Sequence, residues 1–160
     1  MDQNLFKVKG TYVNGEWFNE SKTYEVFNPS NNSVLAKIPI SSPEELELAV
    51  QSASKAQREW SKVSIVKRAD LILKLCSRIE DRAEEFALMD TYNAGKAITF
   101  ARKDVLQAVA NMKYFAGLVR EVKGETFSMK PKHLNFSRQQ PNGVVLKINS
   151  FNRPFRWWAE

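Results

Sequence analysis

The sequence predicts an α/β fold, and three observations along the chain predict it. Hairpin signals fill the first 40 residues, three long stretches with helical hydrophobic spacing follow, and alternating or β-branched segments return after Pro131. The composition agrees, since 43% hydrophobic and 26% charged residues are typical of a globular chain and exclude the collagen-like and disordered classes. With 160 residues, the chain has room for one ordinary hydrophobic core.

The N-terminal segment is expected to form two β-hairpins. Asn14-Gly15 stands between two short apolar stretches and is typical of a type I′ turn, which needs two positive φ angles. Tyr24–Phe27 and Val34–Ile40 have extended character and are separated by a polar turn cluster. These segments provide the second hairpin.

Three long helices are expected next. The first spans residues 43–60, with Ser42 as N-cap and Glu45 closing a capping box, and its apolar stripe is expected to face a core. The second spans about residues 64–90 without interruption, and the third spans 98–119. All three are amphipathic, so they are expected to pack together.

The C-terminal part is expected to return to strand structure. His133–Arg138 alternates like a strand with one buried face, and Val144–Ile148 is β-branched enough for a buried strand. No helix is expected to cover that last strand, so the sequence reads as cut off at the start of an α/β unit. Trp157 and Trp158 are then expected to pack against residues outside this chain.

Several kinds of site are excluded by residue counts. The single cysteine, Cys76, and the single histidine, His133, exclude an internal disulfide and leave too few ligands for a zinc site, so no metal is expected. The six glycines are not clustered, which excludes a dinucleotide-binding or Walker phosphate loop. Cys76 lies on the apolar stripe of a helix, which favours a buried structural thiol over a catalytic nucleophile.

The charge distribution and hydropathy bear on partners and location. The net charge is +6, and residues 120–160 hold 8 basic against 3 acidic side chains. These charges are spread singly without a nucleic-acid motif, so solvated surface or contact with another protein segment is favoured, and nucleic-acid binding is the weaker alternative. No apolar run long enough to cross a membrane and no secretory signal occur, which predicts a cytoplasmic location without membrane contact.

A series of short motifs occurs in order along nearly the whole chain: Tyr12-Val13-Asn14-Gly15-Glu16-Trp17, Phe27-Asn28-Pro29, Ser42-Pro43-Glu44-Glu45, Arg68-Ala69, Gly95-Lys96, Tyr114-Phe115-Ala116-Gly117 and Pro141-Asn142-Gly143-Val144-Val145. Taken together, these motifs resemble the N-terminal portion of the NAD(P)-dependent aldehyde dehydrogenase superfamily. Each is weak alone, but their order and spacing together are specific. Because members of the superfamily are roughly three times as long, the chain resembles a truncated member.

The segment from Ile148 to Phe155 resembles the superfamily's Ile-x-Pro-Trp/Phe-Asn-x-Pro sequence. The resemblance implies that Asn152 is the asparagine whose amide donates to the substrate oxyanion. It also implies that Ile148, Ser150 and Phe151 line the nicotinamide and ribose side of a site for NAD or NADP. Ser150 stands where the superfamily usually has proline. Without the resemblance, Asn152 is interpreted as a turn residue that follows a strand.

The function implied by the resemblance is oxidation of an aldehyde to a carboxylic acid with NAD or NADP, in a homo-oligomeric parent enzyme. The nucleophilic cysteine and the glutamate base of that reaction have no counterpart here, so the chain alone is expected to be inactive. The alternative is a non-catalytic interaction protein that pairs with full-length homologues through a strand edge.

The resemblance also divides the chain into three parts. Residues 1–130 correspond to the N-terminal β and helical part of the cofactor-binding domain. Residues 131–141 correspond to an arm strand that joins subunits, and residues 142–160 to the first strand of a Rossmann-like cofactor domain and the start of the oxyanion segment.

Overall fold

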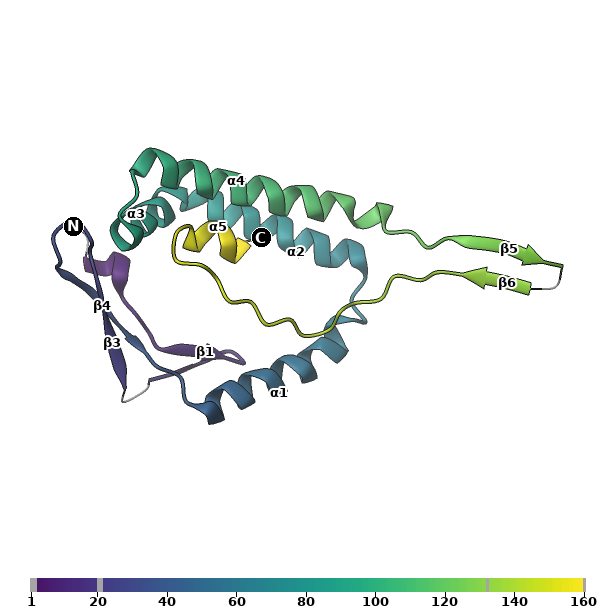
Figure 1. The fold of residues 1–160 in the computed structure, drawn as a ribbon, viewed down its shortest axis with the longest axis horizontal. Helices are drawn as coiled ribbons and strands as arrows, with labels where there is room; N and C mark the ends of the chain where they lie inside the picture. Colours follow the sequence, from purple (N-terminus) through teal and green to yellow (C-terminus); the bar gives the residue numbers. More distant parts are fainter. Residues whose placement is uncertain (1–2, 20–21, 132, 160) are drawn as a thin grey trace.

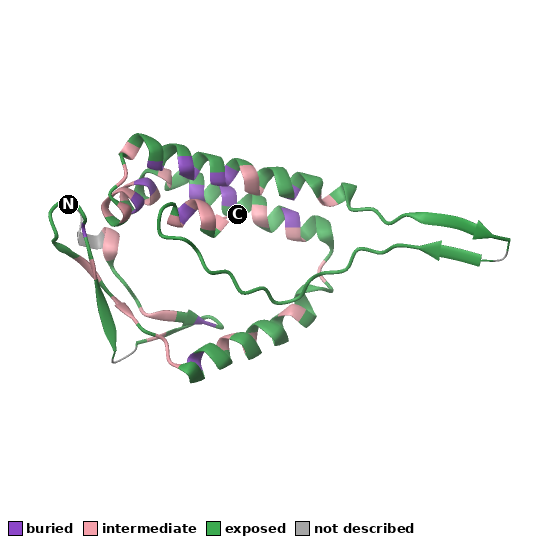
Figure 2. Ribbon diagram, viewed as in Figure 1, coloured by how far each residue is buried: buried purple, intermediate pink, exposed green. Residues whose placement is uncertain are grey.

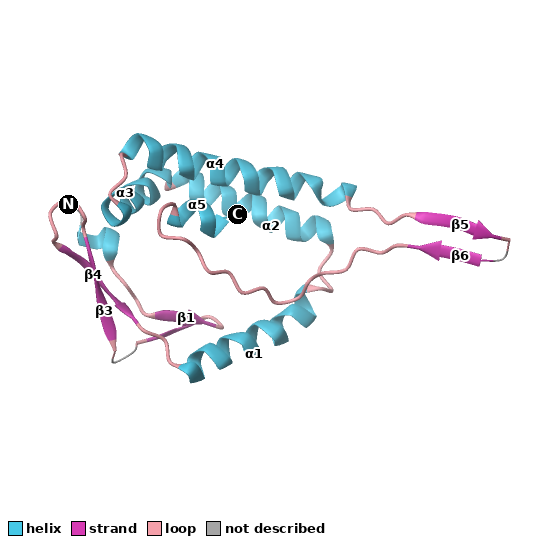
Figure 3. Ribbon diagram, in the orientation of Figure 1, coloured by secondary structure: helices cyan, strands magenta, loops and turns pink. Residues whose placement is uncertain are grey.

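The computed structural model describes residues 3–19, 22–131 and 133–159. Two helices, α2 (Ile65–Asp81) and α4 (Ile98–Gly117), run side by side through its centre (Figure 1). All strands among the described residues belong to three separate two-stranded antiparallel hairpins. The structure is therefore a mixed α/β arrangement in which a helical core carries small hairpins (Figure 3).

The two N-terminal hairpins are confirmed. A short 3-10 helix, η1 (Gln3–Phe6), precedes β1 (Thr11–Val13), which pairs with β2 (Glu16–Phe18). Between them Asn14 and Gly15 have φ angles of 52° and 91°, as a type I′ turn requires. In the second hairpin, β3 (Thr23–Phe27) pairs with β4 (Val34–Pro39).

Helix α1 (Pro43–Trp60) begins as the sequence predicts but does not bury its stripe. The Ser42 hydroxyl accepts the Glu45 backbone N–H at 3.2 Å, and the Glu45 carboxylate accepts the Ser42 N–H at 3.0 Å, so the capping box is confirmed. Leu46 and Val50 are exposed, because α1 lies apart from α2 and α4 and contacts β1 instead (Figure 1). The expectation that this stripe faces a core is not met within the described residues.

The predicted continuous helix over residues 64–90 is wrong, because the structure divides it. Helix α2 ends at Asp81 and α3 (Ala83–Ala94) begins two residues later. Arg82 between them has φ −119° and ψ 19°, and its guanidinium pairs with Glu85 in the first turn of α3 at 2.7 Å. The change of direction lets α3 pack against α4 and η1.

The buried core lies where α2, α3, α4 and the C-terminal helix α5 (Pro154–Ala159) meet, which Figure 2 shows as the concentration of buried residues. Its buried members are Cys76, Ile79, Ala87, Ala101, Val105, Ala108, Val109 and Phe155. Most of these side chains are small, so the helix axes can approach closely. Cys76 is 0% exposed, which confirms its expected burial.

A hairpin projects from the end of α4 (Figure 1). A 3-10 turn, η2 (Leu118–Glu121), leads to β5 (Thr126–Lys130), which pairs with β6 (His133–Phe136). The sequence predicted strand structure from His133 onward but not β5. The described residues of both strands are exposed throughout.

The segment that follows corrects one expectation. Residues 144–148 form no strand: Leu146 and Ile148 are 84% and 87% exposed, because no described segment supplies a neighbouring backbone for them to pair with. The short helix α5 follows and leaves these residues uncovered, but Phe155 at its start is buried in the core of this chain. Trp158 remains half exposed. Among the described residues, no helix is both long and apolar enough to cross a bilayer.

Candidate functional site

The candidate site lies at the junction between the extended segment and α5. Asn152 stands two residues before Pro154, which opens the helix. The helix is held to the core by Phe155, whose ring lies 4.6 Å from that of Phe86 on α3. A second ring contact joins Phe155 to Trp158 at 5.8 Å. The contact with Phe86 and the burial of Phe155 in the core fix the position of α5 and, with it, the end of the segment that carries Asn152, whereas the contact with Trp158 lies within α5 itself.

A cluster of charges also ties this junction to the helices. The ammonium of Lys96 lies 2.6 Å from an Asp104 oxygen and 3.3 Å from an Asp90 oxygen, with all three side chains largely buried. Arg153 and Arg156 lie 3.7 Å and 3.9 Å from Asp104. Because Arg153 follows Asn152 directly, the cluster connects α4 to the residue beside the candidate donor.

Burial raises the pKa of the Asp90 carboxyl above its ordinary value. Lys96, through its charge and a hydrogen bond, acts to lower this pKa, as does a hydrogen bond from the Phe155 backbone to the carboxylate. The negative charge of Asp104 acts to raise it. Asp90 therefore holds a proton more readily than an exposed aspartate does. Its contacts with Lys96 and with the backbone of Phe155 join α3 to the start of α5.

The amide of Asn152 has a defined orientation. Its Oδ1 accepts a hydrogen bond from the Ser150 hydroxyl at 2.7 Å and another from the Trp157 indole N–H at 3.1 Å. Its Nδ2 has no hydrogen-bond partner among the described residues, and the residue is exposed. The arrangement leaves the two N–H donors of the amide available to an external acceptor.

Other asparagines in the chain are used differently. The amide oxygens of Asn28 and Asn31 each accept the backbone N–H and the hydroxyl of a serine two residues later, which is how asparagine stabilises a turn. Asn152 accepts only from side chains. Its amide is therefore not part of a backbone turn of the kind that Asn28 and Asn31 form.

The other sequence-predicted site residues are brought together only in part. Ser150 contacts Asn152 as described, whereas Ile148 and Phe151 are 87% and 88% exposed, and Phe151 lies with Asn152 in the turn that precedes α5. From the sequence, Trp157 was expected only to pack against residues outside this chain. Its indole N–H, five residues after Asn152, is the functional contact that sequence reasoning missed.

Cys76 lies outside this site. Its thiol is wholly buried on α2, and this burial raises its pKa. The positive charge of Lys113 acts to lower the pKa, and the negative charge of Glu80 acts to raise it. The thiol is therefore a poor source of thiolate. Among the described residues, no group of three or more histidine, cysteine, aspartate or glutamate side chains is placed to hold a metal ion.

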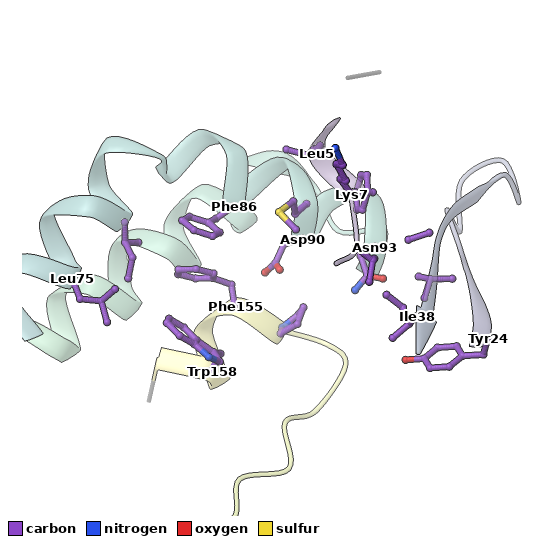
Figure 4. A pocket seen from close by; sticks show the side chains of 17 residues that line it. Leu5, Lys7, Tyr24, Ile38, Leu75, Phe86, Asp90, Asn93, Phe155 and Trp158 are labelled. Atoms are coloured by element: carbon purple, nitrogen blue, oxygen red, sulfur yellow. The ribbon is translucent and has the colours of Figure 1, made fainter. Parts of the chain in front are cut away.

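A cavity of about 570 Å³ lies next to the junction, between α2, α3, α5 and the β3–β4 hairpin (Figure 4). Its walls are mainly apolar, with Phe86, Phe155 and Trp158 on one side and Tyr24 and Ile38 on the other. A second cavity of about 920 Å³ lies between the start of α2, the end of α4 and residues 137–141. Neither is lined by Asn152.

Comparisons with known proteins agree along nearly the whole chain. A sequence profile described as the aldehyde dehydrogenase family matches residues 17–160. An aldehyde dehydrogenase-like protein of Schizosaccharomyces pombe is 32% identical over 146 residues, which are 91% of this chain and 29% of that protein.

Two solved structures show the same likeness. A 3,6-anhydro-L-galactose dehydrogenase in complex with NADP is 27% identical with a TM-score of 0.87, over 94% of this chain and 32% of that chain. An NAD⁺ complex of an aldehyde dehydrogenase from Bacillus cereus is 31% identical with a TM-score of 0.80, over 86% of this chain and 29% of that chain. The chain thus spans about three tenths of the length of the relatives that it matches.

Proposed function

Because the chain belongs to the aldehyde dehydrogenase family, we propose that it is part of an enzyme that oxidises an aldehyde to a carboxylic acid with NAD or NADP. Within that reaction the chain supplies the amide of Asn152 as a donor to the substrate oxygen. The observation that carries the proposal is the orientation of this amide, whose oxygen is occupied by Ser150 and Trp157 while its nitrogen faces outward. The cofactors of the two solved relatives support the choice of acceptor.

The chemistry of the proposed donor follows from where charge develops. When a nucleophile adds to an aldehyde carbonyl, negative charge forms on the oxygen, and a fixed N–H donor stabilises it more than it stabilises the neutral carbonyl. Loss of one such donor typically slows turnover by a factor of about 100 to 1,000. The thiol of Cys76 does not serve as this nucleophile, because it is buried and its pKa is raised.

The residues before Asn152 fit one half of a dinucleotide site. Ile148, before the turn that carries Asn152, and Phe151, within it, present exposed apolar side chains, and the Ser150 hydroxyl lies between them in sequence, which suits an aromatic ring with a polar edge. The cofactor, when bound, accepts a hydride from the substrate carbon. No clustered glycines occur in this chain to supply backbone N–H groups for a pyrophosphate, so Ile148, Ser150 and Phe151 provide only the nicotinamide side.

The three-part division of the chain belongs to the same proposal. Residues 1–130 and 142–160 belong to the cofactor-binding domain, and residues 131–141 form part of an arm between subunits of a homo-oligomer. The support for an arm is that β5 and β6 project from the helices and are exposed along their length (Figure 1). Residues 144–148 become the first strand of the cofactor domain once neighbouring strands pair with them.

A second function, a non-catalytic interaction protein, is favoured by the same hairpin. Met129, Leu134 and Phe136 are exposed on it, and its outer strand edges can pair with another chain. In this case the chain binds full-length relatives and contributes no catalytic group.

The experiment compares the 160-residue chain with a hybrid enzyme, in which this chain replaces the matching part of the Bacillus cereus relative. Reduction of NAD and NADP is followed with a panel of aldehydes. We expect no turnover by the chain alone and turnover by the hybrid enzyme. Asn152→Ala should lower that turnover at least about 100-fold, whereas Asn31→Ala, an exposed asparagine in a distant turn, should not.

Two results would contradict the proposal. Turnover by the chain alone would show that the missing nucleophile is not needed. Unchanged turnover in the Asn152→Ala hybrid enzyme would remove the donor role. Co-purification of the chain with an intact relative, together with an inactive hybrid enzyme, would favour the interaction protein.

A further inference from the structure

We propose that Trp157 and Ser150 are positioning residues that hold the Asn152 amide with its nitrogen toward the substrate. The inference rests on the proposed function of Asn152 as the oxyanion donor. Both side chains contact the same atom, Oδ1 of Asn152, from opposite sides in sequence: Ser150 from two residues before and Trp157 from five residues after.

An exposed asparagine amide does not orient itself. Its terminal torsion is broad and roughly two-fold, so rotation exchanges the amide oxygen with the amide nitrogen at small cost. With the oxygen outward, the amide would repel a developing oxyanion, and with the nitrogen outward it donates to it. An oxyanion donor on an exposed segment therefore needs a partner that distinguishes oxygen from nitrogen.

Trp157 makes that distinction because an indole N–H can only donate. The indole nitrogen lies 3.1 Å from Oδ1 of Asn152. If the amide were rotated so that its nitrogen faced the indole, two N–H donors would face one another and no hydrogen bond could form, so that orientation is disfavoured. The Ser150 hydroxyl at 2.7 Å adds a second hydrogen bond, but a hydroxyl can donate or accept and so follows the amide. Trp157 thus selects the orientation and Ser150 strengthens it.

The indole is itself held in place. Trp157 is partly buried on α5, and the Arg156 guanidinium lies 5.9 Å from its ring. Helix α5 is anchored by Phe155 in the core and by the contacts of Arg153 and Arg156 with Asp104. The orienting donor is therefore attached to the helical core, while Asn152 lies on the exposed segment that needs orienting.

The first test detects the hydrogen bond without catalysis. Ultraviolet resonance Raman spectra report whether an indole N–H is hydrogen-bonded, and the chain has four tryptophans. Asn152→Ala should remove the signal of one hydrogen-bonded indole, and Trp157→Phe should remove the same signal. Asn152→Asp keeps an acceptor oxygen and should keep the signal. An unchanged spectrum in Asn152→Ala would overturn the proposal.

The second test uses the hybrid enzyme and separates kcat from KM. Trp157→Phe keeps the ring and its packing but loses the N–H, and should lower kcat about tenfold while leaving KM within about twofold. Ser150→Ala should lower kcat to a smaller extent, and Ser150→Thr should restore it. Trp158→Phe, at the neighbouring exposed tryptophan, should change neither constant.

Double variants distinguish this inference from the function on which it rests. If the indole acts through Asn152, Trp157→Phe has no further effect once Asn152→Ala is present. If Asn152→Ala lowers kcat but Trp157→Phe and Ser150→Ala do not, the positioning role is overturned and the donor role stands. If Asn152→Ala leaves kcat unchanged, the donor role itself fails. Should Trp157→Phe fail to fold, the indole signal in Asn152→Ala, where Trp157 is intact, still decides whether the indole N–H is bonded to this amide.

Discussion

Removal of the buried lysine charge at Lys96 should be among the most destabilising single changes in the chain. Lys96→Met keeps the length and the apolar stem of the side chain and deletes the ammonium that faces Asp90 and Asp104. Those carboxylates are only 7% and 8% exposed, so water cannot replace the lost partner. Breaking a buried ion pair in this way costs about 3–5 kcal/mol. We expect the free energy of unfolding to fall by about 3 kcal/mol, the lower end of this range, because Arg153 and Arg156 still neutralise part of the charge of Asp104.

The matched control is Lys113→Met. Lys113 lies 2.7 Å from Glu80, nearly as close as Lys96 lies to Asp104 at 2.6 Å, but these side chains are 45% and 42% exposed. An exposed ion pair contributes at most about 1 kcal/mol. Urea denaturation of the 160-residue chain, followed by tryptophan fluorescence at concentrations low enough for the midpoint to be independent of concentration, measures both losses.

The loss at Lys96 should also depend on pH. The pKa of Asp90 is raised in the folded state, so the folded chain binds this proton more tightly than the unfolded chain does. Lowering the pH through the interval between the folded-state and unfolded-state pKa values of Asp90 therefore stabilises the fold. Lys96 acts to lower that pKa, so Lys96→Met moves the upper end of the interval to higher pH. The deficit of the variant should therefore shrink as the pH falls from neutral toward the ordinary pKa of an aspartate. Equal losses for Lys96→Met and Lys113→Met, or a deficit that does not shrink, would refute this reasoning.

Two further predictions concern reactivity and association. The thiol of Cys76, buried and with a raised pKa, should react with an alkylating reagent far more slowly than a free cysteine in the native chain and at the free rate in urea; rapid native labelling would contradict its burial. The isolated chain should associate with itself as its concentration rises, since Leu146, Ile148 and Phe151 are each more than four-fifths exposed and the β5–β6 edges are open. Sedimentation velocity measures the association, and a compact monomer at high concentration would speak against it.

Features set by neighbouring residues could be predicted from the sequence. The capping box at Ser42 and Glu45 and the turn at Asn14-Gly15 depend on interactions within four residues, and the structure has both. The burial of Cys76 followed from its place on a helical stripe. Each of these is decided by local chemistry.

Features that depend on distant partners could not be predicted. The apolar stripe and the helix-forming residues continue through Arg82, and no glycine or proline marks the end of α2 there. Residues 144–148 have the propensity of a strand, but a strand exists only where another backbone pairs with it, and none among the described residues does. At the candidate site, the position of Asn152 came from the resemblance. The contact with Trp157 depends on how α5 turns back, which sequence spacing does not reveal.

The projecting β5–β6 hairpin tolerates sequence change along its strands but not at its base. Gly124 lies so close to the Ser137 carbonyl oxygen that a side chain at this position would overlap it. Beside it, the backbones of Glu125 and Ser137 are joined by a hydrogen bond of 2.8 Å, and the Glu125 N–H donates to the Ser137 hydroxyl at 2.9 Å. The exposed positions of the two strands can change without disturbing this junction, whereas a side chain at Gly124 would separate the two backbones at the base. The surface of the hairpin can therefore vary in sequence while the way it joins the helices stays the same.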